Sequence, residues 1–203
     1  MATDTYKTIK IPSEGYFIDK RSKFYAFAYP VETEDEIKEH LSVLKKQYYD
    51  ARHHVYAWIL GADKSRYRIN DDGEPSGSSA KPIYGQLLSN DLTNIVIFVV
   101  RYFGGVKLGV PGLINAYRTA AQDAIQNAEI IEKTVEDCFE LRYDYLMMNE
   151  VMKILKEEPI TIISQEFDNQ CKIHFRTRRC DSSKVKNRFE QVSELILNKI
   201  DLP

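Results

Sequence analysis

Cysteine is scarce in this chain, which has three in 203 residues: Cys138, Cys171 and Cys180. Their number is odd, and no two of them are spaced as Cys-x-x-Cys. These features argue against a disulfide framework and against a cysteine-based zinc site, and they indicate a reducing compartment. We therefore expect a cytoplasmic protein that holds no metal and no cofactor.

Long apolar runs and an excess of one charge are also missing. The longest apolar run covers residues 95–100, far too few to span a bilayer. Eight charged residues among the first thirty leave no apolar core for a signal peptide. The 28 basic and 30 acidic residues give a formal net charge of -2, so no field of one sign steers the whole molecule toward nucleic acid. We expect no membrane contact, and the sequence does not indicate an oligomeric state.

The composition is that of an ordinary globular protein, with 43% hydrophobic and 29% charged residues. Alternating and helical patterns follow each other and predict an α+β fold. Residues 1–131 are expected to form the first domain, with strands at 6–10, 15–19, 23–29, 53–60 and 94–101. Helices are expected from a Thr33 cap to about residue 48, at 83–89, and from Pro111 to about residue 128. Alanines along the last helix predict that it lies close against a sheet.

The charged stretch 132–137 is the candidate linker to a second domain, residues 138–203. Strands are expected at 139–145, 161–167 and 171–177, with one helix at 146–157 and another from a Ser182 or Ser183 cap to about residue 200. This βαββα order is the beginning of a ferredoxin-like unit, which is βαββαβ in full. The last strand of such a unit is not evident in the sequence.

One loop after residue 70 gathers carboxylates and hydroxyls: Asp71, Asp72, Glu74, Ser76 and Ser78. Carboxylates near a histidine can hold a divalent metal or act as acid and base. His53 and His54 alternate across their strand, so one of them can reach this loop. His53, Asp72 and Glu74 are therefore catalytic candidates, although no metal-ligand spacing is recognisable. The alternative is a turn whose acids accept backbone N–H groups.

A glycine-rich loop joins the strand 94–101 to the following helix, and it carries Arg101, Gly104, Gly105 and Lys107. A strand, a glycine-rich loop and a helix N-terminus in this order can hold an anion with backbone N–H groups and a lysine. We expect these four residues, with Ser76 and Ser78, to bind phosphate or nucleic acid. Neither standard nucleotide-binding glycine pattern occurs. The alternative is that the glycines only permit tight packing of the helix on the strand.

A basic cluster in the second domain is a further candidate for contact with nucleic acid. The alternative is a solvated strand edge protected by charge. Between residues 172 and 188 there is one acid, Asp181, against seven basic residues: Lys172, Arg176, Arg178, Arg179, Lys184, Lys186 and Arg188.

The two loops together resemble those of the YigZ/IMPACT family. The resemblance rests on residues 22–24, 50–57 and 81–83, on Asp71-Asp72-Gly73-Glu74-Pro75-Ser76-Gly77, and on Arg101-Tyr102-Phe103-Gly104-Gly105-Val106-Lys107-Leu108-Gly109. It covers most of residues 15–130, whereas the C-terminal part is similar to the family in its element order only. Departures from the family pattern are Ser78-Ser79-Ala80 for Thr-Ala-Gly, Pro111 for a glycine, and Asn115 for an arginine near the glycine-rich loop.

This resemblance implies an N-terminal domain like the second domain of a small-subunit ribosomal protein and a C-terminal domain like the last domain of elongation factor G. Both of those proteins contact ribosomal RNA, although fold alone does not determine function. Eukaryotic IMPACT proteins regulate translation through protein–protein contact. Our leading hypothesis is a non-enzymatic binding protein of the translation system, in contact with RNA or a ribosome-associated protein. A metal-assisted hydrolase of a phosphorylated or nucleotide substrate is the alternative, and a regulator that binds only protein is a third hypothesis.

Overall fold

The chain forms two compact units, which a computed structural model describes for residues 4–168, 170–192 and 194–200. The N-terminal unit comprises residues 6–133, and the C-terminal unit comprises the described residues from 134 onward together with Asp4 and Thr5. Helices and strands are mixed in both units, which confirms the α+β class. No helix among the described residues is both long and apolar enough to cross a membrane.

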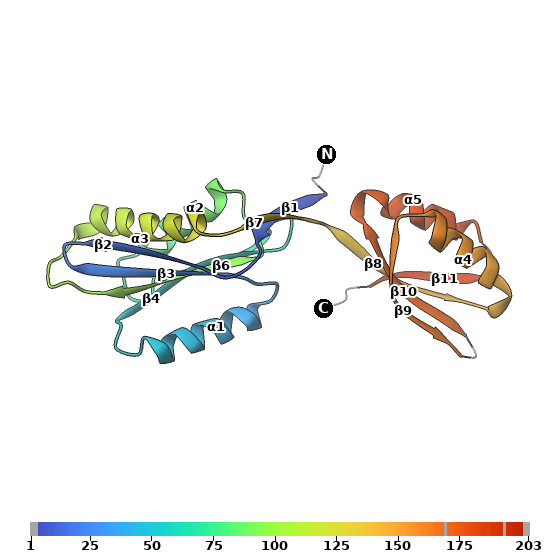
Figure 1. Cartoon of the computed structure of the whole chain (residues 1–203), viewed down its shortest axis with the longest axis horizontal. Helices are drawn as coiled ribbons and strands as arrows, with labels where there is room; N and C mark the ends of the chain where they lie inside the picture. The colour runs from blue at the N-terminus through green and yellow to red at the C-terminus, as the bar shows by residue number, and fades with distance from the viewer. Residues whose placement is uncertain (1–3, 169, 193, 201–203) are drawn as a thin grey trace. The chain divides into compact units, whose positions relative to one another are not determined.

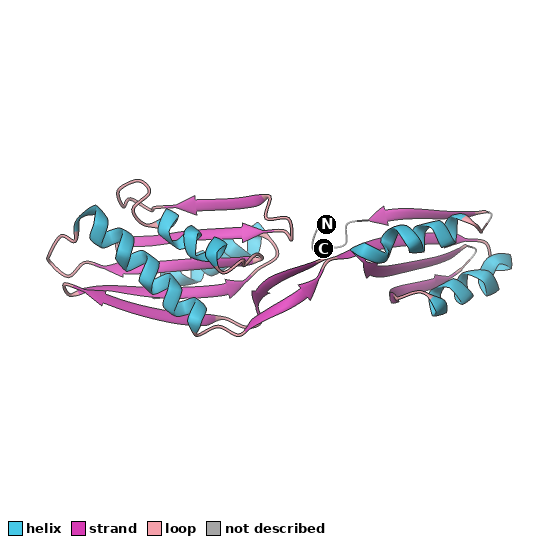
Figure 2. Cartoon of the chain, turned by 90° about the horizontal axis from the view of Figure 1, so that it is seen from above, coloured by secondary structure: helices cyan, strands magenta, loops and turns pink. Residues whose placement is uncertain are grey.

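The N-terminal unit is built on a five-stranded antiparallel sheet in the order β2-β3-β6-β4-β5. Figure 2 shows its strands side by side. One of them, β5, is absent from the predicted strands, because an edge strand with exposed side chains has no apolar face to recognise. The bounds are β2 (Ser13–Asp19), β3 (Ser22–Pro30), β4 (His53–Leu60), β5 (Arg66–Asn70) and β6 (Ile95–Tyr102).

Helices cover both faces of this sheet. The helices α2 (Ala80–Ser89) and α3 (Gly109–Gln126) lie on one face, and α1 (Glu34–Gln47) lies on the other (Figure 1). Successive residues of β4 and β6 therefore enter two different cores, which explains why both strands are apolar throughout. The expected cap of α1 is present, because the Thr33 hydroxyl accepts the Glu36 N–H in a capping box.

The alanine-rich helix α3 lies close against β2, as its composition predicts. The Ser13 hydroxyl donates to the Ala124 carbonyl at 2.8 Å. A Cβ atom on Gly15 would fall onto the backbone of Ala120 and Ala124. Small side chains on the helix and a glycine on the strand are thus both needed for this approach.

The C-terminal unit has the order βαββαβ, with an antiparallel sheet in the order β11-β8-β10-β9. The expected helix to about residue 200 is wrong, and the last strand, which is not evident in the sequence, is present. The helix α5 ends at Glu190, Glu194 adopts a left-handed turn conformation, and β11 follows with alternating burial. The elements are β8 (Glu136–Tyr143), η1 (Tyr145–Met147), α4 (Met148–Glu157), β9 (Ile160–Phe167), β10 (Cys171–Arg178), α5 (Arg179–Glu190) and β11 (Leu195–Ile200).

The expected linker 132–137 contains the point at which the two units divide, between Lys133 and Thr134, and it has regular secondary structure. It contains the end of β7 (Ile130–Thr134), which pairs with β1 (Thr5–Ile9), and the beginning of β8. Glu132, Lys133 and Glu136 are exposed and Asp137 is buried, so a polar composition alone does not distinguish a linker from a strand.

Asp4 caps α5 from a distant position in the sequence. Its carboxylate accepts the Cys180 backbone N–H and the Arg178 side-chain N–H, both at 3.1 Å, and its carbonyl accepts the Val135 N–H at 2.8 Å. The expected cap, Ser182 or Ser183, is wrong, because Ser182 lies within the helix and donates to Asp137 at 2.8 Å. The C-terminal unit therefore includes residues from both sides of the N-terminal unit.

Candidate functional site

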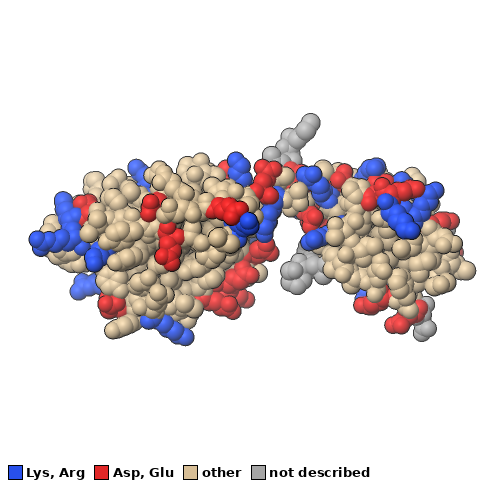
Figure 3. Space-filling model, viewed as in Figure 1, with Lys and Arg blue, Asp and Glu red and all other residues tan. Residues whose placement is uncertain are grey.

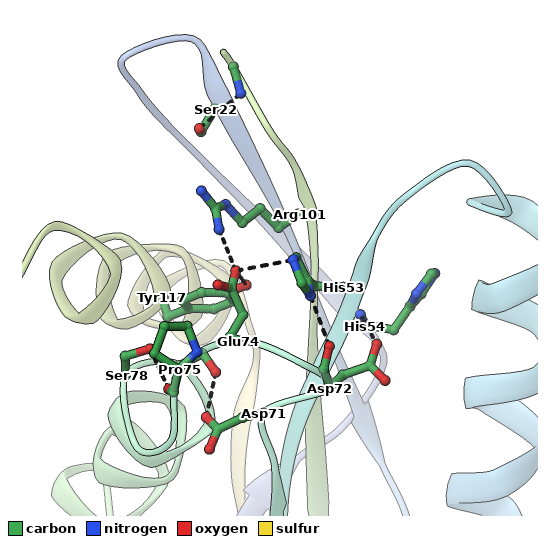
Figure 4. Close-up of polar contacts among 12 residues, drawn as sticks. Ser22, His53, His54, Asp71, Asp72, Glu74, Pro75, Ser78, Arg101 and Tyr117 are labelled. Carbon is green, nitrogen blue, oxygen red and sulfur yellow. Dashed lines mark hydrogen bonds and ion pairs between the residues drawn. The ribbon is translucent and has the colours of Figure 1, made fainter. Parts of the chain in front are cut away.

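Glu74 is the centre of the site formed by the two loops (Figure 4). Its side chain is buried, and one carboxylate oxygen accepts from Arg101 at 2.6 Å and from the Tyr117 hydroxyl at 2.7 Å. The Nε2 atom of His53 lies 4.0 Å from the same oxygen. Burial and the charge of Glu74 raise the pKa of Tyr117 well above its ordinary value, so this hydroxyl remains a donor. The acid loop, the glycine-rich loop and α3 are thus joined through one carboxylate.

Arg101 is held inside this arrangement and is not a free cation. Its side chain is 8% exposed. Its guanidinium lies 5.6 Å from the Phe24 ring centre and 5.8 Å from that of Phe103. The Nε atom is buried without a hydrogen-bond partner among the described residues. The structure therefore gives Arg101 the role of joining Glu74 to Phe103, with its charge already balanced.

Asp71 caps the helix α2. Its carboxylate accepts the backbone N–H groups of Ala80 and Gly77 at 2.8 and 2.9 Å, and the Ser79 hydroxyl at 2.5 Å. Burial alone would raise the pKa of Asp71, but these hydrogen bonds outweigh it and hold the pKa below its usual value. Asp71 thus serves the backbone of the loop.

Asp72 holds the beginning of β4. Its carboxylate accepts the His54 backbone N–H at 2.6 Å, and its own carbonyl oxygen lies 2.8 Å from Nδ1 of His53. Since a carbonyl oxygen only accepts, Nδ1 of His53 carries the hydrogen in this contact. His54 lies on the other face of the strand, where burial lowers its pKa. Of the two histidines, His53 is the one that reaches the loop site.

The three acids of the loop point to different partners and do not converge on a common point. Among the described residues, no group of three or more His, Cys, Asp and Glu side chains is placed to hold a metal ion. Asp71 and Asp72 fit the alternative in which loop acids accept backbone N–H groups. Ser76 is exposed, whereas Ser78 is buried and donates its hydroxyl to the Pro75 carbonyl at 2.6 Å. The arrangement suits a rigid binding loop.

A pocket of about 460 Å³ lies between the two loops. Apolar side chains form much of its wall, and a few polar groups converge on it, as is usual for a ligand site. Arg52 and Phe103 are not among the predicted site residues, since the sequence shows neither the exposure of Phe103 nor the direction in which the Arg52 side chain points. The residues that line the pocket include Arg52, His53, Glu74, Arg101, Phe103 and Lys107.

The glycines of the second loop shape the backbone. The Gly104 N–H donates to the Ser22 hydroxyl at 3.1 Å, and a Cβ atom on Gly104 would fall onto the backbone of Arg21 and Ser22. Gly105 has a φ of +87°, which favours glycine. The loop is thereby fastened to the turn between β2 and β3, and the N–H of Gly104 is already used.

Five exposed cations surround this region, and none forms an ion pair with a described residue: Lys20, Arg21, Lys23, Arg52 and Lys107. We call them the loop-end cations, and the loop end comprises the β2–β3 turn, residues 71–79 and residues 103–108. Basic atoms gather at this end of the N-terminal unit in Figure 3, at the left. The loop end therefore presents five cations that have no carboxylate partner among the residues that the structure describes.

The basic cluster of the C-terminal unit has a different environment, because each of its seven cations has a carboxylate partner. Acidic atoms border the basic ones on this unit in Figure 3. The ion pairs are Lys172 with Glu140 and Glu166, Arg176 with Glu136, Arg178 with Asp4, Arg179 with Asp137, Lys184 with Glu158, Lys186 with Glu190, and Arg188 with Glu157 and Glu158.

Comparison with known proteins finds one matching family model, the Impact N-terminal domain, over residues 20–125. The IMPACT family member YvyE of Bacillus subtilis is 30% identical over 98% of this chain and 90% of its own length. The protein IMPACT homolog of Saccharomyces cerevisiae is 28% identical over 58% of this chain and 48% of its own length. A crystal structure of a hypothetical protein matches 99% of this chain and 100% of its own, with 24% identity and a TM-score of 0.75. That last likeness concerns the fold alone.

Proposed function

Because the chain belongs to the IMPACT family, we propose that it is a non-enzymatic regulatory protein of the translation system that contacts RNA through its loop end. Translational regulation is the role that the family resemblance implies. The same resemblance implies a small-subunit ribosomal protein fold for the N-terminal unit and the fold of the last elongation factor G domain for the C-terminal unit. A protein with this role acts in the cytoplasm.

The observation that carries the proposal is the free positive charge of the loop end. Phosphate backbones release condensed counterions when cations neutralise them, so unpaired lysines and arginines contribute most to binding. Phe103 lies among these cations with half of its surface exposed. An aromatic side chain beside cations is the arrangement on which bases of single-stranded nucleic acid stack.

The residues of the site then have separate roles. Lys107 and Arg52 border the pocket and contact phosphate. Arg101 and Glu74 form a neutral, buried support that keeps Phe103 in place. Gly104 and Gly105 give the loop its path, and Asp71 fixes the neighbouring loop on α2. No step of bond cleavage is required of any of them.

The test is fluorescence anisotropy with a labelled single-stranded RNA at several salt concentrations. We expect binding that weakens with salt. In Arg52→Gln/Lys107→Gln the slope of log affinity against log salt should be shallower by ~1.4, about 0.7 for each lost phosphate contact. Both side chains are exposed and unpaired, so this variant should fold normally.

The matched control is Lys184→Gln/Lys186→Gln, which removes the same charge from cations that have carboxylate partners. Its slope should equal that of the wild type. An equal decrease of the salt slope in both variants would show a general charge effect and contradict the assignment to the loop end. No binding by the wild type at any salt concentration would overturn RNA contact and favour the protein-binding hypothesis.

A further inference from the structure

The turn between β2 and β3 contains two residues in an unfavourable backbone conformation. Asp19 pairs with Ser22, so the turn consists of Lys20 and Arg21, with φ angles of 44° and 66°. Two-residue turns with positive φ at both positions are usually formed by Asn-Gly, because other side chains are strained there. A lysine followed by an arginine therefore makes this hairpin less stable than it could be.

Packing does not explain these two residues. Both are exposed, and neither side chain forms a hydrogen bond or ion pair with the part of the chain that the structure describes. The turn is nevertheless fixed in place, since Ser22 is buried and its hydroxyl accepts the Gly104 N–H. Two strained cations are thus presented at a defined position beside the glycine-rich loop, and strain of this kind is often found at functional sites.

A second hollow lies next to these cations. It measures about 380 Å³, and it is lined by Arg21, Lys23, Tyr102 and Phe103, with other aromatic side chains. Phe103 also lines the first pocket, so this residue borders both hollows. Each hollow is therefore lined by Phe103, by further aromatic or apolar side chains, and by cations.

The second hollow contains one acid, Asp50. Its carboxylate accepts the Tyr102 hydroxyl at 2.6 Å, and this hydrogen bond raises the pKa of Tyr102 to about 12. Tyr102 thus stays neutral at ordinary pH. Arg21 and Lys23 outweigh the single negative charge in this hollow.

We propose that the Lys20-Arg21 turn is the outer phosphate contact of a single-stranded RNA site in which Phe103 separates two successive bases. This inference rests on the proposed function and specifies the ligand as an unpaired strand. A duplex keeps its bases stacked on each other and cannot place them in two hollows. An isolated phosphate would use the cations of one hollow and gain nothing from the ring between them.

The turn allows an unusual test, because stability and binding should change in opposite directions. Lys20→Asn/Arg21→Gly removes both charges and supplies the residues that the turn favours. We expect a higher melting temperature than the wild type. We also expect weaker binding to a labelled oligouridine, with a salt slope shallower by ~1.4 for two lost phosphate contacts. Folding damage cannot produce this combination.

Further variants separate the contributions of charge, turn strain and base stacking. Lys20→Gln/Arg21→Gln removes the charges and keeps the strained turn, so binding should weaken without a rise in melting temperature. Phe103→Ala should lose affinity for oligouridine with an unchanged salt slope, and Phe103→Tyr should restore the affinity, because stacking does not depend on counterion release. Lys184→Gln/Lys186→Gln serves again as the charge-matched control.

The outcomes distinguish this inference from the proposal on which it rests. If wild-type protein does not bind oligouridine, the proposed function fails. If the wild type binds, but the Lys20-Arg21 variants have the same salt slope as the wild type, the turn is not a phosphate contact and the inference is overturned. Equal affinity for an RNA duplex, or for inorganic polyphosphate, would overturn the role of Phe103 between two bases.

Discussion

The loop end and the basic cluster of residues 172–188 differ in where their counter-charges lie. The cluster is denser in sequence, with seven cations against one local acid, yet strands and helices bring a carboxylate to each cation. The loop-end cations are scattered over residues 20–107, and no carboxylate of the described part of the chain lies within ion-pair distance of them. Charge density along a sequence is therefore a poor guide to free charge on the surface.

The strongest test of this comparison is Glu74, the carboxylate that neutralises a cation at the loop end. Glu74→Gln would leave the Arg101 charge buried without a partner, and we expect the free energy of unfolding to fall by ~3–5 kcal/mol. Urea denaturation measures this change. Asp35→Asn, in the exposed pair with Lys38, is the control and should leave the free energy of unfolding nearly unchanged. If Glu74→Gln lowered the free energy of unfolding as little as Asp35→Asn does, Arg101 would not depend on Glu74 and would resemble the loop-end cations.

Asp71 tests whether the acids at the loop end serve the backbone. At neutral pH, Asp71→Asn should cost ~1 kcal/mol, the usual contribution of a helix cap. Because the folded-state pKa of Asp71 is lowered, its stabilising effect is present above the ordinary value of 3.8 and is lost as the pH falls through the folded-state pKa. The difference between wild type and variant should thus shrink on acidification. A difference that stays constant down to pH 2 would contradict the role of the charge.

A further test removes the carboxylate partner of a cation in the C-terminal unit and asks whether that cation then contacts RNA. In Glu136→Gln, Arg176 loses the carboxylate that lies 3.2 Å from it. If free charge decides binding, the salt slope for RNA should become steeper by about 0.7 when Arg176 gains a phosphate contact. An unchanged slope would mean that this surface fails to meet RNA for another reason. Glu39→Gln, on the exposed side of α1, is the charge-matched control.

The smallest effect is expected at Lys186, whose pair with Glu190 is exposed on both sides. Lys186→Ala should change the free energy of unfolding by less than ~0.5 kcal/mol and leave RNA binding unaltered. Thermal unfolding together with anisotropy would show both. A clear loss of binding would restore the C-terminal cluster as a contact surface.

Much of the N-terminal unit follows from sequence patterns, because β4, β6, α1 and α3 carry strong apolar or capping signals. The end of the C-terminal unit does not. Residues 195–197 are apolar without a break, and such a run suits a helix or a strand equally well. The turn at Glu194, in a left-handed conformation that glutamate seldom adopts, leaves no mark in the sequence.

The candidate site, too, could be predicted only in part from the sequence. The two loops could be recognised from their glycines, acids and cations, but the partner of each side chain could not. Arg101, near the end of β6, and Lys107, in the loop that follows, are six positions apart, yet Arg101 is buried against Glu74 and Lys107 is exposed. Which of them meets solvent depends on Phe24, Tyr117 and Glu74, which come from three other parts of the chain.

The cap that Asp4 places on α5 has a consequence for how the chain folds. The C-terminal unit is discontinuous, since the whole of the N-terminal unit is inserted between Thr5 and Thr134. Closing so long a loop in an unfolded chain costs entropy. Pairing of β1 with β7 removes most of that cost in advance, because it brings the two ends of the insertion together. We therefore expect the N-terminal unit to fold first and to bring the two segments of the C-terminal unit together. A substitution that destabilises the N-terminal unit, such as Glu74→Gln, should then also destabilise α5.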